Sequence, residues 1–477
     1  MQVLSVLLTT VGQVDHLRRF LTTSAFPILS SIEVYVDPAI AKNIHFTNSS
    51  YWIHKNFPML EELLTNCIMV APDNLESRFP RLEDLALDAE LLEWRETRTI
   101  AEDRKVLSAL MDAIVMQIKR VTLRSVLLPG MPYDDIYDFF ALEKLRIEDR
   151  WECMDMLSRL RVPETAQVTL AVHTNAELYK PNIVTKGLWR NFLPPNWKDV
   201  FPCVHLTTAV SFHMALHIPF FKKSGIPLTN GILISGAKDP SLLAKPQDWD
   251  NPGRSAPETW TVAVPNCVAG RIDPYDVPAV AFREIPKLVN CTRLTWLELH
   301  TPPDVQPRTE ELDTNELLPL LQLLQSVVHL AVGGTRAIAC LWWACEGNRD
   351  LLPALRELAL CLTFGHPDAG GDELDDMDHA PCLGALTDPK RAAYGGGLRR
   401  LMFRVPPASG GGRLKDHHGA YVEATWRRAE ELRAVALEYL DDVVVEERFC
   451  HSCHDGGPDY TGEEDELQLI LGDQRKS

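Results

Sequence analysis

The chain has 477 residues, 45% of them hydrophobic, and a formal net charge of −18. The negative charge excludes nucleic acid and anionic membrane surfaces as main partners, and 11 cysteines at scattered spacings predict reduced thiols inside a cell. Residues 1–8 lack the basic region of a signal peptide and no apolar run is long enough to span a membrane, so we expect a soluble cytoplasmic or nuclear protein.

A short apolar frame, L-x-x-L-x-L, recurs along the chain and determines the predicted fold. Its last two apolar residues share one face of a strand, because side chains alternate between the two faces. In chain order the frame begins at Leu29, Leu60, Leu82, Ile118, Leu142, Leu294, Val327, Leu355, Leu398 and Leu432. So short a strand cannot form a core alone and needs a similar strand beside it, which predicts a solenoid of stacked repeats.

Helices are predicted between the strands. The frames are spaced unevenly, often further apart than the roughly 20–29 residues of regular leucine-rich repeats. A 3.6-residue apolar period indicates helices over residues 3–20, 104–119, 314–324, 337–345 and 421–431. We therefore predict an α/β fold: an irregular leucine-rich-repeat-like solenoid (horseshoe) of short parallel strands alternating with helices.

Four regions are expected from the composition. Residues 1–173 and 291–449 hold the N-terminal and C-terminal repeat-like units. Residues 174–290 are rich in proline and aromatic residues and are interpreted as diverged repeats with long loops, an inserted domain being the alternative. Strands outside the frame are predicted at 168–172, 231–235 and 259–263. The acidic segment 450–477 is predicted to be disordered.

Three motifs could have a chemical role. Segment Cys450–His454 (CHSCH) supplies half of a zinc site, but no second cysteine pair lies at a matching distance. His417 and His418 lack a carboxylate partner placed by spacing, and the glycine-rich segments 395–397 and 410–412 lack the Lys-Ser/Thr of a phosphate-binding loop. The sequence therefore predicts no catalytic residue, no metal ligand and no cofactor.

The frame is clearest in the segments Phe79–Leu87, Leu294–His300 and Leu352–Leu360. With these segments the chain resembles fungal F-box proteins that have leucine-rich-repeat-like tails. The resemblance implies a non-enzymatic substrate receptor of a cullin-based ubiquitin ligase, in which the F-box docks an adaptor and the repeats hold a protein target. No Leu-Pro-x-Glu-like start of an F-box lies in residues 1–66, so the adaptor is expected as a partner only if an F-box lies upstream of Met1.

The residues between the inward-facing leucines predict where a target binds, because their side chains point to the opposite, exposed face. Four basic residues fall at such positions on two consecutive frames: Arg120, Arg124, Lys144 and Arg146. Trp296 is a candidate aromatic anchor further along. On an acidic chain this basic cluster favours an acidic or phosphorylated protein segment, ordinary solvated charge being the alternative.

The same alternation predicts that other residues are exposed as well, among them Glu148, Glu298, His300, Met402 and Arg404. The runner-up function is an enzyme or a zinc-binding protein that uses the tryptophan-rich centre or the Cys450–His454 turn.

Overall fold

The computed structural model describes residues 2–23, 27–36, 57–65, 79–88, 111–112, 115, 117–124, 136–150, 156–173, 193, 196–218, 229–243, 258–265, 285–301, 314–348, 350–362, 380–388, 397–406 and 416–448. They form a mixed α/β structure in which 15 strands belong to a large, mostly parallel sheet. Among the described helices, none is both long and apolar enough to cross a membrane.

Two compact units divide the chain. Unit 1 comprises residues 1–210, 233–272 and 287–290, and unit 2 comprises residues 211–232, 273–286 and 291–477. Two of the breaks between the units fall inside strands, one after residue 210 in β10 (Ala209–Ile218) and one after residue 232 in β11 (Thr229–Ala237). Both strands belong to the proline- and aromatic-rich region 174–290.

The elements up to the boundary are β1 (Gln2–Leu8), α1 (Val11–Thr23), β2 (Leu29–Val36), β3 (Glu62–Thr65), β4 (Asp84–Asp88), β5 (Arg120–Arg124), β6 (Tyr137–Asp138), β7 (Lys144–Arg150), β8 (Leu160–Arg161), β9 (Gln167–His173), α6 (Trp197–Val200) and η5 (Pro202–Leu206). Then follow β10 (Ala209–Ile218), β11 (Thr229–Ala237), η6 (Pro240–Leu242), β12 (Thr259–Pro265) and η8 (Cys291–Arg293). Unit 2 continues with β13 (Trp296–His300), α8 (Thr314–Leu323), β14 (His329–Gly333), α9 (Thr335–Gly347), β15 (Glu357–Cys361), α10 (Ala380–Leu386), β16 (Arg400–Val405), α11 (Asp416–Ala436) and β17 (Asp442–Glu447).

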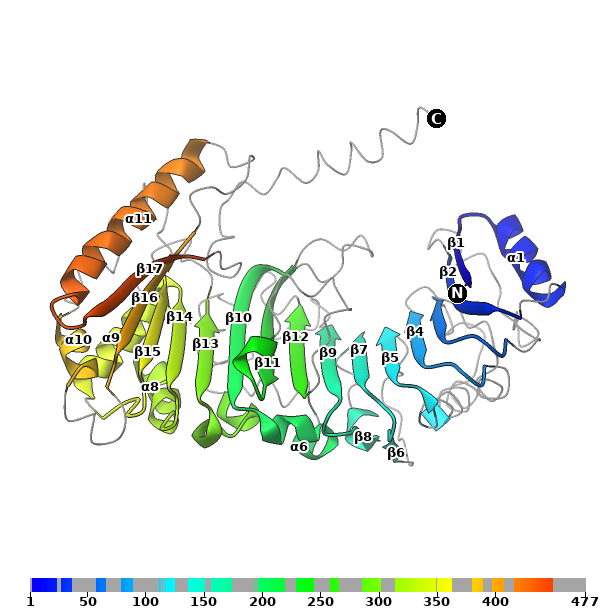
Figure 1. Ribbon diagram of the computed structural model, residues 1–477, viewed down its shortest axis with the longest axis horizontal. Coiled ribbons are helices and arrows are strands. Elements are labelled where there is room, and N and C mark those ends of the chain that lie inside the picture. Colours follow the sequence, from blue (N-terminus) through cyan, green and yellow to red (C-terminus); the bar gives the residue numbers. More distant parts are fainter. Residues whose placement is uncertain are drawn as a thin grey trace. The chain divides into compact units, whose positions relative to one another are not determined.

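The apolar frames form parallel strands in register. In unit 1 the fourth frame position, or its equivalent, is aligned across neighbouring strands β2 to β9 at Ile32, Leu63, Leu85, Val121, Leu145 and Val168. In unit 2 the strands β13 to β17 follow one another in chain order across the sheet (Figure 1). Their aligned residues are Leu297, Leu330, Leu358, Leu401 and Val443. All of them are at most 5% exposed. The stacking that the frame predicts is therefore present within each unit.

A tight turn leads into the frames. The frame's first residue donates its backbone N–H to the carbonyl three residues earlier, as Leu82 does to Phe79 (3.0 Å) and Leu355 to Leu352 (3.1 Å). In unit 1, Phe57 and Phe79 occupy equivalent places before their frames, and their rings pack at 6.0 Å. Both are buried, so they extend the apolar column that begins on the strands.

Two of the predicted elements are wrong in whole or in part, and one is only partly described. The helix predicted over residues 3–20 is wrong in its first part, because Gln2–Leu8 form strand β1, which pairs in parallel with β2. Its second part is confirmed as helix α1, which begins at Val11. The frame at Leu432 is not a strand: it is the end of helix α11, and its Val435 and Leu437 are 39% and 47% exposed. The strand follows as β17. Of the helix predicted over 104–119, residues 111–112, 115 and 117 are helical, residues 118 and 119 are not, and the remaining residues lie outside the described ones.

An aromatic core lies in the part of unit 1 outside the leucine frame. The predicted strands at 168–172, 231–235 and 259–263 are confirmed as β9, β11 and β12. Trp260 on β12 is 1% exposed, packs edge-on against Trp197 at 5.5 Å and donates its indole N–H to Thr207 Oγ1 at 2.8 Å. Gly236 leaves room for the indole, because a Cβ there would lie 2.3 Å from Trp260 Cε2.

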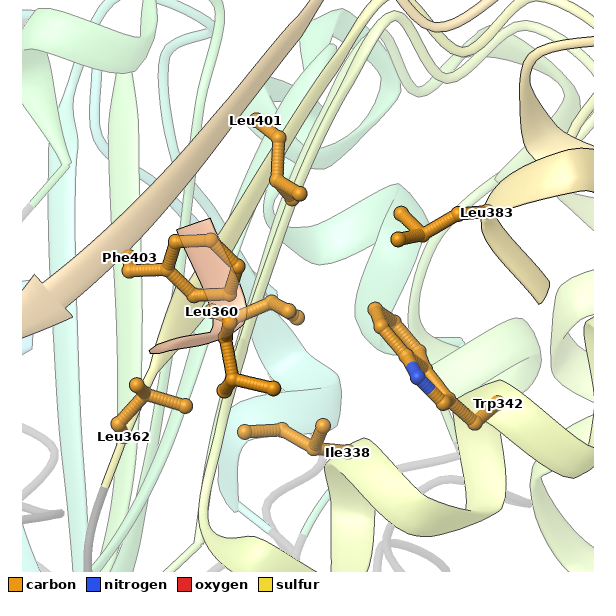
Figure 2. Close-up of a pocket in the computed structure, with 8 residues that line it drawn as sticks. Ile338, Trp342, Leu360, Leu362, Leu383, Leu401 and Phe403 are labelled. Atoms are coloured by element: carbon orange, nitrogen blue, oxygen red, sulfur yellow. The ribbon is translucent and has the colours of Figure 1, made fainter. Parts of the chain in front are cut away.

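Helices α9, α10 and α11 pack on the leucine face of unit 2. Ile338 and Trp342 of α9 and Leu383 of α10 point toward the strand residues Leu360 and Phe403 (Figure 2). The space between them is about 10 Å³, at the lower limit for one water molecule, so this is a well-packed core and not a ligand pocket. The helices predicted over 314–324, 337–345 and 421–431 are confirmed as α8, α9 and α11.

Candidate functional site

The face of unit 2 opposite the leucines is also buried, and it carries polar residues. Register alignment places Glu298, Ala331, Ala359 and Met402 in one row across β13 to β16. The two alanines are fully buried and Met402 is 8% exposed. Parallel sheets are commonly covered on both faces. The polar side chains of this face therefore meet in an environment with little water.

A cluster of two histidines and one glutamate lies on this face. Glu298 and His300 are two residues apart on β13 and so point the same way, and His213 comes from β10, the neighbouring strand. One ligand atom from each of these residues lies within 4.8 Å of the others. All three residues are buried, at 7%, 9% and 3% exposed for His213, Glu298 and His300. We call these residues the His–Glu–His cluster.

His300 faces the carboxylate directly, and His213 is connected to it through the hydroxyl of Ser211. His300 Nε2 lies 3.5 Å from Glu298 Oε2. His213 Nε2 lies 2.6 Å from the hydroxyl of Ser211, which in turn lies 3.4 Å from the same carboxylate oxygen. The rings stack nearly parallel, with centroids 4.6 Å apart and planes at 15°. The Oε2 atom of Glu298 is therefore the point on which the cluster converges.

A second set of contacts holds the other carboxylate oxygen. Trp296, on the same strand face, donates its indole N–H to Glu298 Oε1 at 3.2 Å. The indole stacks on His329 of β14, with planes at 8° and centroids 3.4 Å apart. His329 Nδ1 in turn lies 3.1 Å from Glu357 Oε2 on β15. This relay fixes the rotamer of Glu298 and leaves Oε2 facing the histidines.

The electrostatics of the cluster favour an ionised carboxylate. Burial alone would disfavour the charge of Glu298, but the hydrogen bond from His300 and the charges of His300, His213 and Arg404 together hold its pKa well below the usual range. Burial also opposes the charge of Arg404, yet Cys361, Glu298 and Glu446 together raise its pKa. Arg404 Nε pairs with Glu446 at 3.3 Å.

His329 differs from the two clustered histidines in its surroundings. Burial lowers its pKa, opposed by the hydrogen bond to Glu357, so the ring favours the neutral form. Its Nε2 is buried without a hydrogen-bond partner in the described part of the chain. Among the described residues, His329 belongs to no group of three ligating residues.

Two imidazole nitrogens and one carboxylate oxygen form a donor set that suits a divalent transition-metal ion. The same three groups without a metal form a buried hydrogen-bonded network with Ser211. A carboxylate flanked by imidazoles can also exchange a proton with them. The cavity lined by Ile338, Trp342 and Leu383 lies on the leucine face and not at this cluster.

The predicted exposure of this face is wrong for unit 2. Glu298, His300, Met402 and Arg404 were expected to face solvent, but each is at most 9% exposed. Glu148 of unit 1, expected to be exposed as well, is fully buried. The alternation was correct, since these residues do point away from the leucines. What the pattern does not reveal is whether that second face is itself covered.

The predicted basic cluster lies on adjacent strands of unit 1. Arg120 pairs in register with Lys144, and Thr122 pairs with Arg146. Arg120 Nε forms an ion pair with Asp84 Oδ2 at 2.9 Å, and Arg146 forms an ion pair with Glu148. Arg124 is on β5, but its side chain lies outside the described residues.

The three described basic side chains differ in exposure. The side chain of Arg120 is 45% exposed, that of Arg146 only 16%, and Lys144 is half-buried. Burial, followed by the neighbouring charge of Arg146, lowers the pKa of Lys144 to about 8. Trp296, the predicted aromatic anchor, is half-buried in unit 2 and already engaged by Glu298 and His329.

The other motifs of the sequence contribute no described site. His417 and His418 lie in the first turn of α11, not on a loop, and their side chains are outside the described residues. Residues 395–396, 410–412 and 450–454 also lie outside the described residues. Cys203 is buried, which raises the pKa of its thiol to about 12 and leaves it unreactive near neutral pH.

The His–Glu–His cluster was not predicted from the sequence, because its residues come from one strand with a leucine frame and one strand without it. The pattern Trp296-x-Glu298-x-His300 sits within a leucine frame, and its period of two shows that the three side chains share a face. Ser211-x-His213 shows the same period on β10, which carries no leucine frame. Nothing in the sequence indicates that these two strands are neighbours.

Comparison of the chain with protein-family models gives no match, and comparison with curated proteins gives none either.

Proposed function

We propose that the chain is a non-enzymatic protein-interaction receptor, built as an irregular leucine-rich-repeat-like solenoid (horseshoe) and acting like the target-binding repeats of F-box ubiquitin-ligase subunits. Its target is a protein segment that is acidic or phosphorylated. The working surface is the polar face of the unit 1 strands β4, β5 and β7.

One observation carries this proposal: the apolar frame stays in register on parallel strands, so the outward residues of those strands also line up in rows. One such row holds Glu62, Asp84, Arg120 and Lys144. Rows of outward polar side chains on stacked repeats give repeat proteins their extended binding surfaces. At Arg120 and Lys144 this row becomes basic, although the chain carries a net charge of −18.

The pairings in this row set the kind of target that can bind. An incoming anion competes with Asp84 for Arg120, and the exposed ion pair between them is weak enough to be displaced. An anion beside Lys144 would restore the pKa that burial and Arg146 lower. A phosphate, with its high charge and several acceptor oxygens, meets both requirements better than one carboxylate does.

Affinity capture with a charge-reversed surface tests the proposal. We expect the full chain to capture a specific protein from native cells, and R120E/K144E to lose that capture. Arg146 is left unchanged, because its loss would leave the buried Glu148 carboxylate without this ion pair. The charge-matched control is R81E/R161E, which reverses two exposed basic residues of unit 1 outside the row.

The outcomes separate the parts of the proposal. Phosphatase treatment of the lysate abolishes capture if the target is phosphorylated, and leaves it unchanged if the segment is acidic by sequence. Cullin and adaptor subunits in the captured material would support the ligase role, and their absence would leave a receptor without that role. Equal capture by R120E/K144E and by the wild type would reject the basic row as the binding surface.

A further inference from the structure

We propose that His213, Glu298 and His300 bind a divalent transition-metal ion of the Zn²⁺ class. This inference is independent of the protein-binding role, because the cluster lies in unit 2 and the basic row lies in unit 1. The donor atoms are Nε2 of His213, Nε2 of His300 and Oε2 of Glu298.

The distances in the cluster are close to those of a metal site. Tetrahedral Zn²⁺ with bonds of about 2.0–2.2 Å places its ligand atoms about 3.4 Å from one another. His300 Nε2 and Glu298 Oε2 lie 3.5 Å apart, so this edge of the tetrahedron is already formed. One ring nitrogen of each histidine and one carboxylate oxygen of Glu298 lie within 4.8 Å of one another, a separation that a modest rotation of the His213 ring can reduce.

The Ser211 hydroxyl must move before a metal ion can bind between His213 and Glu298. It lies 2.6 Å from His213 Nε2 and 3.4 Å from Glu298 Oε2, so it bridges the two groups that a metal would join. Rotation of the serine side chain would free the lone pair of His213 for the ion. The hydroxyl could then hydrogen-bond to a water molecule in the fourth coordination position, the position that protein ligands leave open in three-ligand zinc sites.

The supporting contacts resemble the outer shell of a metal site. Ligating carboxylates are held by hydrogen bonds to their non-ligating atoms, and such partners tune metal affinity. Trp296 binds Oε1 of Glu298, the oxygen that faces away from the histidines, and the indole is itself held by stacking on His329. The carboxylate is therefore oriented before any ion arrives.

A metal ion would offset the cost of burying the charged carboxylate of Glu298. A buried carboxylate is costly unless it is paired, and here Ser211, Trp296 and His300 supply its hydrogen bonds. A divalent ion bound directly to the carboxylate would compensate this charge more completely than hydrogen bonds alone. Arg404 opposes the ion by its charge, but its ion pair with Glu446 reduces that opposition.

The test is a metal titration of the full chain. Protein freed of metal by a chelator is titrated with Zn²⁺ against a chromophoric competitor, and with Co²⁺ to record its d–d absorption. We expect one equivalent of Zn²⁺ and a Co²⁺ spectrum typical of four-coordinate nitrogen and oxygen ligands. E298Q and H300A should each lose at least 100-fold in affinity, and W296F, which removes the support of Oε1, should lose about 10–100-fold.

Two controls locate the site. H16Q removes an exposed histidine of α1 that contacts no member of the cluster or of its supporting relay, and this variant should still bind one equivalent of Zn²⁺. C450S/C453S removes the cysteine motif near the C-terminus and should also do so. Circular dichroism checks that each variant folds. If H300A does not fold, H213Q provides the same loss of a donor.

Three results would overturn the proposal. One is the failure of the wild-type chain to bind Zn²⁺ or Co²⁺. Another is that E298Q and the folded histidine variant both still bind one equivalent of Zn²⁺. The third is loss of Zn²⁺ binding in C450S/C453S or in H16Q, which would place the ion elsewhere.

Discussion

At the scale of single residues, the ion pair between Arg146 and Glu148 differs most from what the sequence suggests. Glu148 has no exposed side-chain surface, and the side chain of Arg146 is 16% exposed. A buried pair of charges contributes little net stability compared with apolar residues, but the removal of one partner leaves the other charge uncompensated in a medium of low polarity. The neighbouring pair of Arg120 and Asp84 is far more exposed.

We expect R146A to lower the free energy of unfolding by about 3–5 kcal/mol, because it leaves the buried carboxylate of Glu148 without this cation. R120A, which breaks the exposed pair, should cost no more than about 1 kcal/mol. Denaturant unfolding monitored by circular dichroism measures both. The double variant R146M/E148Q should recover part of the loss, and equal effects of the two single arginine substitutions would contradict this assignment.

Lys144 is expected to titrate well below an ordinary lysine. Burial and Arg146 lower its pKa from 10.5 to about 8, whereas the hydrogen bond to Glu83 raises that of Lys119. The neutral amine is the reactive form, so trace acetylation followed by mass spectrometry should give a midpoint near pH 8 for Lys144 and above pH 10.5 for Lys119. Equal labelling of both lysines across that range would refute the difference.

The lowered pKa of Lys144 makes the free energy of unfolding rise with pH over a defined range. Between about pH 8 and pH 10.5 the unfolded chain binds a proton at this lysine and the folded chain does not. The contribution of Lys144 to stability is therefore complete above pH 10.5 and is lost as the pH falls through 8.

At the scale of elements, the leucine frame makes a direct prediction about packing. Leu358 lies between Leu330 and Leu401 on its neighbouring strands and is fully buried. L358A should destabilise unit 2 by about 2–5 kcal/mol, because it removes buried methyl groups and leaves a cavity. L437A, at a position that is 47% exposed, is the matched control and should cost much less. Similar unfolding midpoints for the two variants would argue against the register.

The frame predicts strands well but cannot always tell a strand from a helix. Its first two leucines are three residues apart, a spacing that also lies on one face of a helix. In α11 the buried residues Ala429, Leu432 and Ala436 follow helical spacing, so the frame at Leu432 fits a helix equally well. Residues 2–8 show the converse: an apolar run that allows either structure becomes a strand because β2 offers a partner.

The site was less predictable than the fold. Period-two alternation correctly placed Trp296, Glu298 and His300 on one face, but it says nothing of what covers that face. The small residues Ala331 and Ala359 on the same face were the available signal, since an exposed strand face seldom needs them. The pairing of β10 with β13 depends on a long-range contact that no local pattern encodes.

At the scale of the whole molecule, the two units should respond separately to damage. Gly236 lies against Trp260 in unit 1, where a Cβ would come within 2.3 Å of a rigid buried indole. G236A should therefore cost about 1–3 kcal/mol or more through overpacking. Hydrogen exchange should quicken in β9 and β12 and stay unchanged in β14 and β15.

The control for this substitution is G12A in α1, where the added methyl group meets no atom within 4 Å and alanine favours the helix. It should leave exchange in β9 and β12 unaltered. Faster exchange in β14 and β15 in G236A, to the same degree as in β9, would show that the chain unfolds as one cooperative body.

The interleaving of the two units along the chain has a consequence for synthesis on the ribosome. Unit 1 is interrupted at residue 210 and resumes at residue 233, so the first segment of unit 2 emerges before unit 1 is complete. Until Thr259–Pro265 has left the exit tunnel, strand β9 lacks its partner β12, and its backbone groups form an open edge. The nascent chain thus carries this open edge while residues 174–265 are made, about a fifth of the 477-residue chain. In this period chaperone occupancy and slow codons should affect the yield more than in a protein whose units follow one another in sequence.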